Sequence, residues 1–234
     1  MKWTEIEETT LKENYPTMGY KACDLFPERT ASSVIRKAEL MRLKVDKKIK
    51  DASQEDRIGY LDLEASNLNA NFGICFSWVI KPQGSDELDY AVVTKKEMRD
   101  GTLDKRVIQD FITAIQKYTM VYTYYGSRFD VPFLRTRALM HGLEFPSLGE
   151  RQHRDLYYLV RSKMKLNRNS LETACGSLGI EGKTHINWKF WIRAMTGDKP
   201  SLEYILEHNK GDVIILEELH NRLAKFESMG RRLL

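Results

Sequence analysis

Two acidic side chains alternate with two leucines in the segment Gly59–Glu64, which reads Gly-Tyr-Leu-Asp-Leu-Glu. If this segment is a β-strand, Asp62 and Glu64 lie on one face and the leucines on the other, because successive side chains of a strand point to opposite faces. The two carboxylates are then about 7 Å apart along the strand, and their repulsion favours a cation between them. A half-exposed strand with a polar outer face would have the same alternation.

Two further acidic positions lie in segments of different character. Asp130 closes the run Tyr-Gly-Ser-Arg-Phe-Asp and precedes Val-Pro, so it is also an ordinary candidate for a helix N-cap. Asp212 lies in a strongly helical stretch beside Gly211, a residue that costs a helix about 1 kcal/mol relative to Ala. This glycine predicts either a close approach of backbone or ligand, or a kink. His208 lies one turn before Asp212 on the same helix face, where a histidine is most commonly solvated.

These residues need a scaffold of alternating strands and helices. Hydrophobic patterning predicts strands at 57–64, 72–81, 88–94, 120–124 and 155–158, helices at 105–118 and 131–141, and further helices over most of 158–228. A polar turn containing three asparagines joins the first two strands, which is typical of an antiparallel hairpin. Antiparallel strands followed by βα units predict an α/β fold, a mixed sheet with helices on its faces.

The acidic motifs follow a fixed order: Asp-x-Glu in the first strand, Phe-Asp at a helix start and His-x-x-x-Asp in a late helix. In this order the chain resembles the DEDD 3′–5′ exonucleases, and most closely a branch of predicted bacterial and phage nucleases. The segments that carry the likeness are Leu61–Glu64, Tyr124–Leu134, Arg154–Leu156, Asn169–Leu171, Leu178–Ile180 and His208–Val213. The resemblance implies a ribonuclease H-like mixed sheet flanked by helices for residues 57–234, preceded by a small three-helix domain.

The same resemblance implies a pair of divalent cations held by Asp62, Glu64, Asp130 and Asp212. Carboxylate oxygens without a nearby cysteine favour Mg²⁺ or Mn²⁺ over zinc, because these are hard ligands. Two such ions about 4 Å apart stabilise both the attacking and the leaving oxygen of a phosphodiester. The resemblance therefore predicts a metal-dependent phosphodiesterase. Asp155 is expected to be a structural acid or to support the site from outside rather than to bind metal.

Two positions depart from the pattern of that family. Tyr125 stands where the family usually has Asn, five residues before Asp130; its ring can stack on a base, so we expect it to contact nucleic acid. His208 stands four residues before Asp212, where the matching branch has Tyr, whereas the other main branch has His five residues before. An imidazole with a pKa near 6.5 is a competent general base, and we expect His208 to take this role without binding metal. Alternatively, the two changes leave a damaged site that only binds.

The N-terminal region carries most of the positive charge. Residues 29–50 contain eight Lys and Arg against two acidic residues, so this stretch is +6 within a chain of net charge +4. Residues 1–43 predict three short helices, the first beginning at a Thr4–Glu7 capping box and ending near Asn14. The second covers 18–26, and Thr30 caps the third.

The third of these helices is expected to present Arg36, Lys37 and Arg42 outward with small polar side chains, a surface that suits a DNA groove. A solvated helix face on an accessory bundle would have the same composition. The region resembles the Myb/SANT-like helix-turn-helix module in Trp3, Thr4, Glu7, Leu11, Tyr15, Pro16, Arg29, Thr30, Ala31, Val34, Lys37, Ala38, Leu40 and Leu43. The usual second and third tryptophans are absent. The resemblance implies that Arg36, Lys37 and Arg42 contact DNA.

Composition sets the remaining limits. Residues 44–56 are almost entirely polar and predict a linker. With 42% hydrophobic and 30% charged residues, the chain is neither disordered nor collagen-like. Three cysteines without a Cys-x-x-Cys pair fit a reducing cytoplasm, expected to be that of a bacterium or a phage-infected host. No membrane association is expected, because no apolar run reaches ~20 residues and no secretory signal opens the chain.

Two classes of function remain. The first is a two-metal 3′–5′ exonuclease with an attached DNA-binding module, of which a structure-selective endonuclease is a variant. The second is a DNA-binding protein on a nuclease fold that has lost activity. The complete set of four acids favours the enzyme, because a binding protein needs no such set, and DNA rather than RNA is the expected partner. Trp188, Phe190 and Trp191 are expected in the core, although such rings also stack on single-stranded bases.

Overall fold

The computed structural model describes residues 3–44, 57–146, 153–182 and 187–227. The chain divides into two compact units, Met1–Glu55 and Asp56–Leu234. Apart from Lys44, the predicted linker lies outside the described residues. Within the described residues, no helix combines the length and the apolar character needed to cross a bilayer.

The N-terminal unit is a small helical bundle. Its elements are helix α1 (Glu5–Met18), the 3₁₀-helix η1 (Gly19–Leu25) and helix α2 (Ala31–Leu40). Thr30 caps α2, as predicted, by accepting a hydrogen bond from the backbone of Ser33. Helix α1 does not end near Asn14: it continues through Pro16 for one more turn, where Tyr15 packs against the core. That core consists of Leu11, Phe26, Val34 and Ala38.

The C-terminal unit is built on a five-stranded sheet in the order β3-β2-β1-β4-β5. Its strands are β1 (Ile58–Ala65), β2 (Cys75–Pro82), β3 (Asp89–Val92), β4 (Met120–Thr123) and β5 (His153–Asp155). Strands β1, β2 and β3 are antiparallel neighbours, whereas β1, β4 and β5 pair in parallel. The predicted mixed sheet is therefore confirmed. Because β4 pairs only with Ile58–Tyr60, the second half of β1 extends beyond β4.

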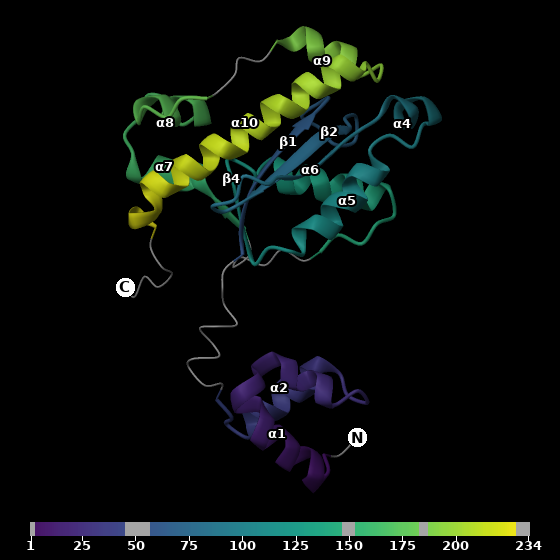
Figure 1. The fold of residues 1–234 in the computed structure, drawn as a ribbon, viewed down its shortest axis with the longest axis vertical. Helices are drawn as coiled ribbons and strands as arrows, with labels where there is room; N and C mark the ends of the chain where they lie inside the picture. Colours follow the sequence, from purple (N-terminus) through teal and green to yellow (C-terminus); the bar gives the residue numbers. More distant parts are fainter. Residues whose placement is uncertain (1–2, 45–56, 147–152, 183–186, 228–234) are drawn as a thin grey trace. The chain divides into compact units, whose positions relative to one another are not determined.

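Helices cover both faces of this sheet (Figure 1). They are α4 (Lys95–Asp100), α5 (Lys105–Ile115), α6 (Asp130–Met140), α7 (Leu156–Lys163), α8 (Leu171–Ser177), α9 (Trp188–Ala194), α10 (Lys199–Leu223) and the 3₁₀-helix η2 (Ala224–Phe226). Helices α5 and α6 lie on one face. The long helix α10 crosses the other face over β1 and β2, with α7 and α8 toward one of its ends and α9 at the other.

The two faces of β1 are buried in different clusters. Leu61 and Leu63 belong to the larger core, which includes the apolar faces of α5 and α6. Tyr60 belongs to the second core, which includes the apolar face of α10. Because side chains alternate along a strand, Asp62 and Glu64 share the face of Tyr60 and lie toward α10.

One predicted strand is displaced, and one helix was missed. The last strand is His153–Asp155 rather than 155–158, because Asp155 begins a helix there: its side chain accepts a hydrogen bond from the backbone of Tyr157 and caps α7. Helix α4 was not predicted, and it begins at a complete capping box formed by Thr94 and Glu97. In both places a short polar side chain supplies the first free amides of a helix with an acceptor.

A buried ion pair fixes helix α6 relative to the sheet. The Nε and NH2 groups of Arg137 donate to the carboxylate of Asp104, and neither side chain is more than 4% exposed. Asp104 also accepts a hydrogen bond of 2.8 Å from the backbone of Cys75, at the start of β2. A further bond from Arg137 to the carbonyl oxygen of Ala70 ties down the loop that follows β1.

Candidate active site

The late helix α10 brings two of the predicted residues to the acidic face of β1. The Nε2 atom of His208 lies 3.6 Å from Oε1 of Glu64 and 4.0 Å from Oδ2 of Asp212. His208 is only 3% exposed, which excludes the alternative of a solvated histidine. The indole of Trp191 covers the imidazole edge-on, with ring centroids 5.9 Å apart. The histidine thus lies in a dry position between two carboxylates.

Asp130 reaches the same strand from the opposite direction. It is the first residue of α6, and Phe129 is the N-cap, so the N-cap interpretation of Asp130 is wrong. Its side chain is 3% exposed. Burial raises the pKa of this carboxyl to about 7, and the charge of Asp155 adds to the effect, while hydrogen bonds from its own backbone and from the backbone of Leu63 oppose it. The bond from Leu63 places Asp130 against β1 between Asp62 and Glu64.

Gly126 allows that approach. A Cβ atom at this position would lie 2.8 Å from Oδ2 of Asp130 and would overlap the side chain of Thr123. Only glycine therefore fits between the end of β4 and the carboxylate. Gly211, in contrast, needs no special explanation: a Cβ atom there would make an ordinary contact of 3.6 Å, and α10 continues through it.

Asp155 holds the loop that leads to Asp130. Its carboxylate accepts hydrogen bonds from the backbone of Tyr125 at 2.7 Å and from the backbone and hydroxyl of Ser127 at 3.0 and 2.6 Å. These bonds and the cap of α7 account for both of its oxygens, which fits the expected structural role. Tyr125 is 46% exposed and has a φ of +65°, a conformation that is strained for a bulky residue.

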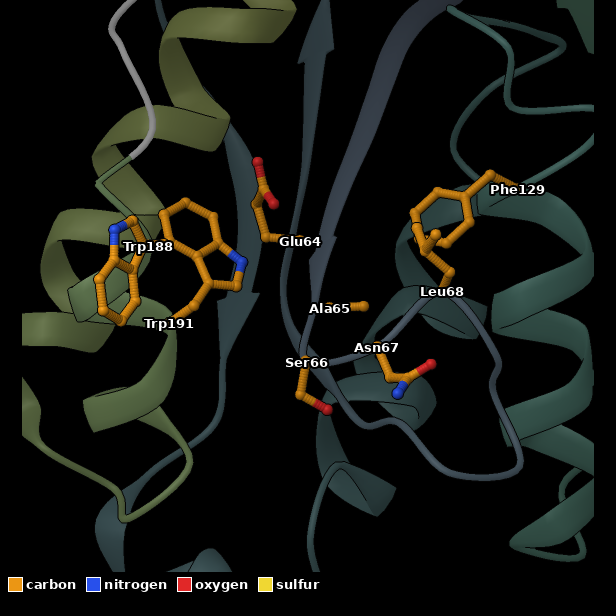
Figure 2. A pocket seen from close by; sticks show the side chains of 8 residues that line it. All are labelled: Glu64, Ala65, Ser66, Asn67, Leu68, Phe129, Trp188 and Trp191. Carbon is orange, nitrogen blue, oxygen red and sulfur yellow. The ribbon is translucent and has the colours of Figure 1, made fainter.

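An aromatic pocket of about 300 Å³ opens beside Glu64. Figure 2 shows the indoles of Trp188 and Trp191 on one side, Leu68 and Phe129 on the other, and Glu64 between them. Trp188 is 63% exposed, so its expected place in the core is wrong. The tryptophans come from α9, whereas Leu68 belongs to the loop after β1. The pocket is therefore assembled from segments that are distant in the sequence.

Within the described residues, no three His, Cys, Asp or Glu side chains converge closely enough to form a ready-made metal site. The donors nevertheless fit a hard divalent cation in their chemistry, since the candidate ligands are carboxylates. Glu64 and Asp212 each have an oxygen within 4.0 Å of the same imidazole nitrogen, and the burial of Asp130 disfavours its charge. A cation would favour the ionised form of each of these groups.

A protein-family model described as the RNase_H superfamily matches residues 59–224. This chain belongs to the RNase H superfamily. The match runs from β1 to the end of α10 and so includes every element that carries the acidic residues. The predicted ribonuclease H-like fold is confirmed, whereas the DEDD assignment and the bacterial or phage branch stay predictions.

Two DNA polymerases are similar to part of this chain. A DNA polymerase of Methanocaldococcus jannaschii is 29% identical over 151 residues, which are 53% of this chain but 9% of the polymerase. The solved structure of the family B DNA polymerase from the hyperthermophilic archaeon Pyrobaculum calidifontis has a TM-score of 0.60 at 18% identity. That similarity covers 73% of this chain and 25% of the polymerase. This chain therefore spans only a small part of either protein.

The N-terminal unit lies outside the part matched by the RNase H family model. Arg36 and Arg42 are exposed, as predicted. Arg42 is not on the third helix, however, because α2 ends at Leu40 and Arg42 has a φ of +55°. Lys37 does not point outward: its ammonium pairs with Glu8 of α1 at 2.5 Å and lies near the ring of Trp3. Lys37 lies on the side of α2 that faces α1 rather than on its outer face.

Three features of the site were not predicted from the sequence. Gly126 and the pocket around Trp188 depend on contacts between distant segments. Asn209, next to His208, is completely buried. The sequence does hold a signal for it, because Asn is a poor residue for a helix interior, and this one lies in line with the buried Ile205 and Leu216 of α10.

Proposed function

We propose that residues 57–234 form a two-metal 3′–5′ exonuclease of the DEDD type and that residues 1–43 form its DNA-binding module. One observation carries the proposal: acidic residues from three separate chain segments lie along the same stretch of β1, residues 62–64. Glu64 and Asp212 share the imidazole of His208, and Asp130 contacts the backbone of Leu63. A fold needs no such gathering of carboxylates for stability, since like charges repel.

Asp62, Glu64, Asp130 and Asp212 would hold the cations, which we propose to be Mg²⁺ or Mn²⁺. Bound there, such ions supply charge stabilisation to a phosphodiester undergoing hydrolysis. His208 is suited to orient a water molecule or accept its proton, because its imidazole faces the carboxylates and is shielded from bulk solvent by Trp191.

The pocket of Trp188 and Trp191 is suited to a nucleobase. Exposed aromatic rings stack on bases of any sequence, each contact contributing about 1–3 kcal/mol. The volume of about 300 Å³ lies at the small end of the range of ligand pockets, which fits one unpaired base rather than a duplex. We therefore propose that the strand end enters the site unpaired, with its terminal base beside Glu64.

DNA is the proposed substrate. Both similar proteins are DNA polymerases, which supports a role on DNA, although each is matched over only a small part of its length. Arg36 of α2 and Arg42, just beyond the end of that helix, are exposed and supply positive charge to the N-terminal module. Phosphate contacts of this kind favour binding without fixing the sequence.

A digestion experiment tests the proposal. Single- and double-stranded DNA and RNA, labelled at the 5′ end, are incubated with Mg²⁺, Mn²⁺ or EDTA, and the products are resolved by length. We expect a ladder of shortening from the 3′ end of single-stranded DNA, which EDTA abolishes. Asp62→Ala and Asp212→Ala should each lower the rate by several orders of magnitude, whereas Asp110→Ala, which removes an exposed acid on α5, should not.

The same experiment separates the alternatives. Cleavage of circular single-stranded DNA would identify an endonuclease. Binding without hydrolysis under every metal condition would identify an inactive nuclease fold. Turnover that persists in Asp62→Ala would show that the site has been placed wrongly.

A further inference from the structure

A buried side-chain amide connects helix α10 to strand β1, the two elements that carry Asp212 and the acidic pair Asp62 and Glu64. Asn209 of α10 is 0% exposed and lies over β1 and β2. In the orientation that gives each amide atom a complementary partner, its nitrogen donates to the carbonyl oxygen of Asp62 at 3.2 Å. Its oxygen accepts from the backbone N–H of Glu64 at 3.3 Å and from the hydroxyl of Ser77 at 3.2 Å.

The partners of this amide are unusually specific. They are the backbone groups of the two acidic residues of β1 themselves, together with a fully buried side chain of β2. An apolar side chain of similar size would pack at the same place but would make none of these bonds. Because a side-chain amide both donates and accepts, only Asn or a close analogue can recognise a carbonyl and an N–H two residues apart on one strand.

Asn209 is close in sequence to two site residues of α10, so its hydrogen bonds to β1 also affect where those residues lie. His208 precedes it directly, and Asp212 follows three residues later on an adjacent part of the helix surface. A hydrogen bond sets both the distance and the direction of its partners, whereas apolar packing leaves a helix some freedom to slide or rotate. The amide therefore fixes α10 in the register that places Nε2 of His208 at 3.6 Å from Glu64.

We propose that Asn209 is a positioning residue, which sets the spacing between the carboxylates of β1 and that of Asp212 and so determines how tightly the site holds a divalent cation. This inference rests on the proposed function, because it assigns the four acids to metal binding. Asn209 contacts the strand backbone and is not itself a metal ligand. Groups that orient metal ligands from outside typically change metal affinity or activity about 10–100-fold when removed.

The test measures Mn²⁺ binding to the full-length protein by calorimetry, together with kcat and KM on a short single-stranded oligonucleotide. We expect Asn209→Ala to weaken Mn²⁺ binding about 10–100-fold and to lower kcat, with little change in KM. The matched control is Leu216→Ala, which removes a buried apolar side chain from the same helix. It should lower the melting temperature at least as much and leave Mn²⁺ affinity unchanged.

Each result of these Mn²⁺-binding measurements either supports or overturns the positioning role of Asn209. Wild-type Mn²⁺ affinity in a folded Asn209→Ala protein would overturn the inference, and so would an equal loss of affinity in Leu216→Ala, since that would mean a general effect of destabilisation. If Asn209→Ala does not fold, Ser77→Ala, which removes one of the three partners, must weaken Mn²⁺ binding in the same direction, and no change there would overturn the inference. Failure of the wild-type protein to bind Mn²⁺ or cleave DNA would instead refute the proposed function.

Discussion

The carboxyl group of Asp130 accepts a hydrogen bond from the backbone of Leu63, the residue that separates Asp62 from Glu64. Asn209 of α10 contacts the same three-residue segment through hydrogen bonds to the backbone of Asp62 and Glu64. Residues 62–64 of β1 are thus held by the first residue of α6 and by α10 together. Because β4 pairs only with Ile58–Tyr60, the strand edge at residues 62–64 is open to Asp130.

Gly126→Ala is expected to disable the site without unfolding the protein. The new Cβ atom would lie 2.8 Å from Oδ2 of Asp130, so the loop or the carboxylate must move. A displacement of about 1 Å in a catalytic arrangement can cost about 10²-fold in rate. Single-turnover hydrolysis measures the effect. Gly176→Ala is the control, because a Cβ atom there has open space. Equal rates for both variants would contradict the role of Gly126.

His208→Ala is expected to lower kcat about 10²–10⁴-fold, the usual cost of losing a general base. Mn²⁺ affinity should change little, because His208 is not proposed as a ligand. His208→Tyr, which restores the residue usual at this spacing in the matching branch, should recover part of the activity. Glu207→Ala, at the exposed neighbouring position on α10, is the control. Wild-type turnover in His208→Ala would dispose of the catalytic role.

Tyr125→Asn separates the strain of this residue from the use of its ring. Asn tolerates a φ of +65° better than Tyr, which relieves about 1–2 kcal/mol of backbone strain. The variant also loses the edge-to-face contact of this ring with Tyr157, which contributes about 0.5–1.5 kcal/mol, so the free energy of unfolding should change by less than about 1.5 kcal/mol. Affinity for single-stranded DNA should fall, because the variant has no exposed ring at this position. Tyr125→Phe keeps both the ring and the strain and should change neither quantity. Denaturant unfolding and fluorescence anisotropy make the two measurements; unaltered DNA affinity in Tyr125→Asn would exclude base stacking.

The double variant Arg36→Ala/Arg42→Ala tests the N-terminal module. For each DNA phosphate that an arginine no longer neutralises, the log–log salt slope of DNA binding should fall in magnitude by about 0.7–0.9, and cleavage of short oligonucleotides should remain. Lys12→Ala, which removes an exposed cation from α1, is the control and should leave the slope unaltered. A slope in the double variant equal to that of the wild type would exclude these arginines as DNA contacts. Deletion of residues 1–50 should give at least as large a change.

Arg137→Leu is expected to cost about 3–5 kcal/mol of unfolding free energy, because it leaves the buried charge of Asp104 without its main partner. Lys96→Ala breaks an exposed ion pair with Asp100 and should cost no more than about 1 kcal/mol. Denaturant unfolding of both variants gives the comparison. Similar losses for the two would mean that solvent reaches Asp104.

Interactions close in sequence account for the parts of the site that could be predicted. Strand alternation alone put Asp62 and Glu64 on one face, and helical spacing put His208 beside Asp212. The mixed sheet followed from the order of the apolar segments, which is also a local pattern. The predicted place of strand β5 was wrong, because the hydrogen bond from Tyr157 to Asp155 begins α7 where the apolar run had suggested a strand.

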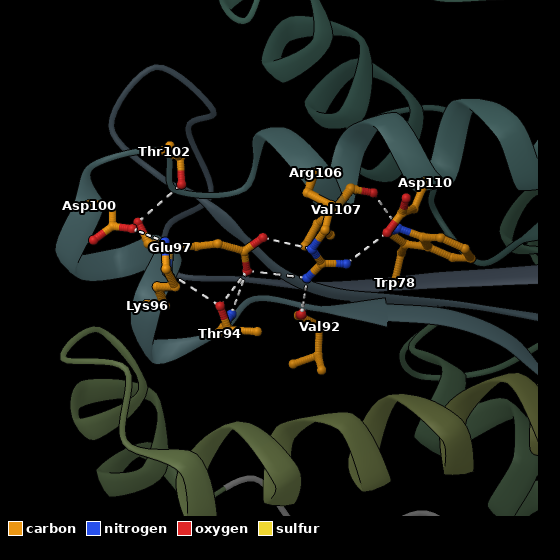
Figure 3. Close-up of polar contacts among 10 residues, drawn as sticks. All are labelled: Trp78, Val92, Thr94, Lys96, Glu97, Asp100, Thr102, Arg106, Val107 and Asp110. Carbon is orange, nitrogen blue, oxygen red and sulfur yellow. Dashed lines mark hydrogen bonds and ion pairs between the residues drawn. The ribbon is translucent and has the colours of Figure 1, made fainter.

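Helix α4 illustrates what long-range contacts add. Thr94 and Glu97 form its capping box, but Glu97 is also engaged by Arg106 of α5, which donates to the carbonyl oxygen of Val92 as well (Figure 3). The segment is too short to be a stable helix in isolation. Its structure therefore depends on a partner that no local pattern identifies.

The order of the acidic residues and the faces on which they lie could be read from the chain alone, because side chains repeat their direction every two residues in a strand and every 3.6 in a helix. Local patterns did not indicate that His208 is buried near Glu64 and Asp212, that Lys37 pairs with Glu8, or that Trp188 is exposed beside a pocket. Burial and pairing depend on which distant segments pack together, and that packing is a property of the whole fold.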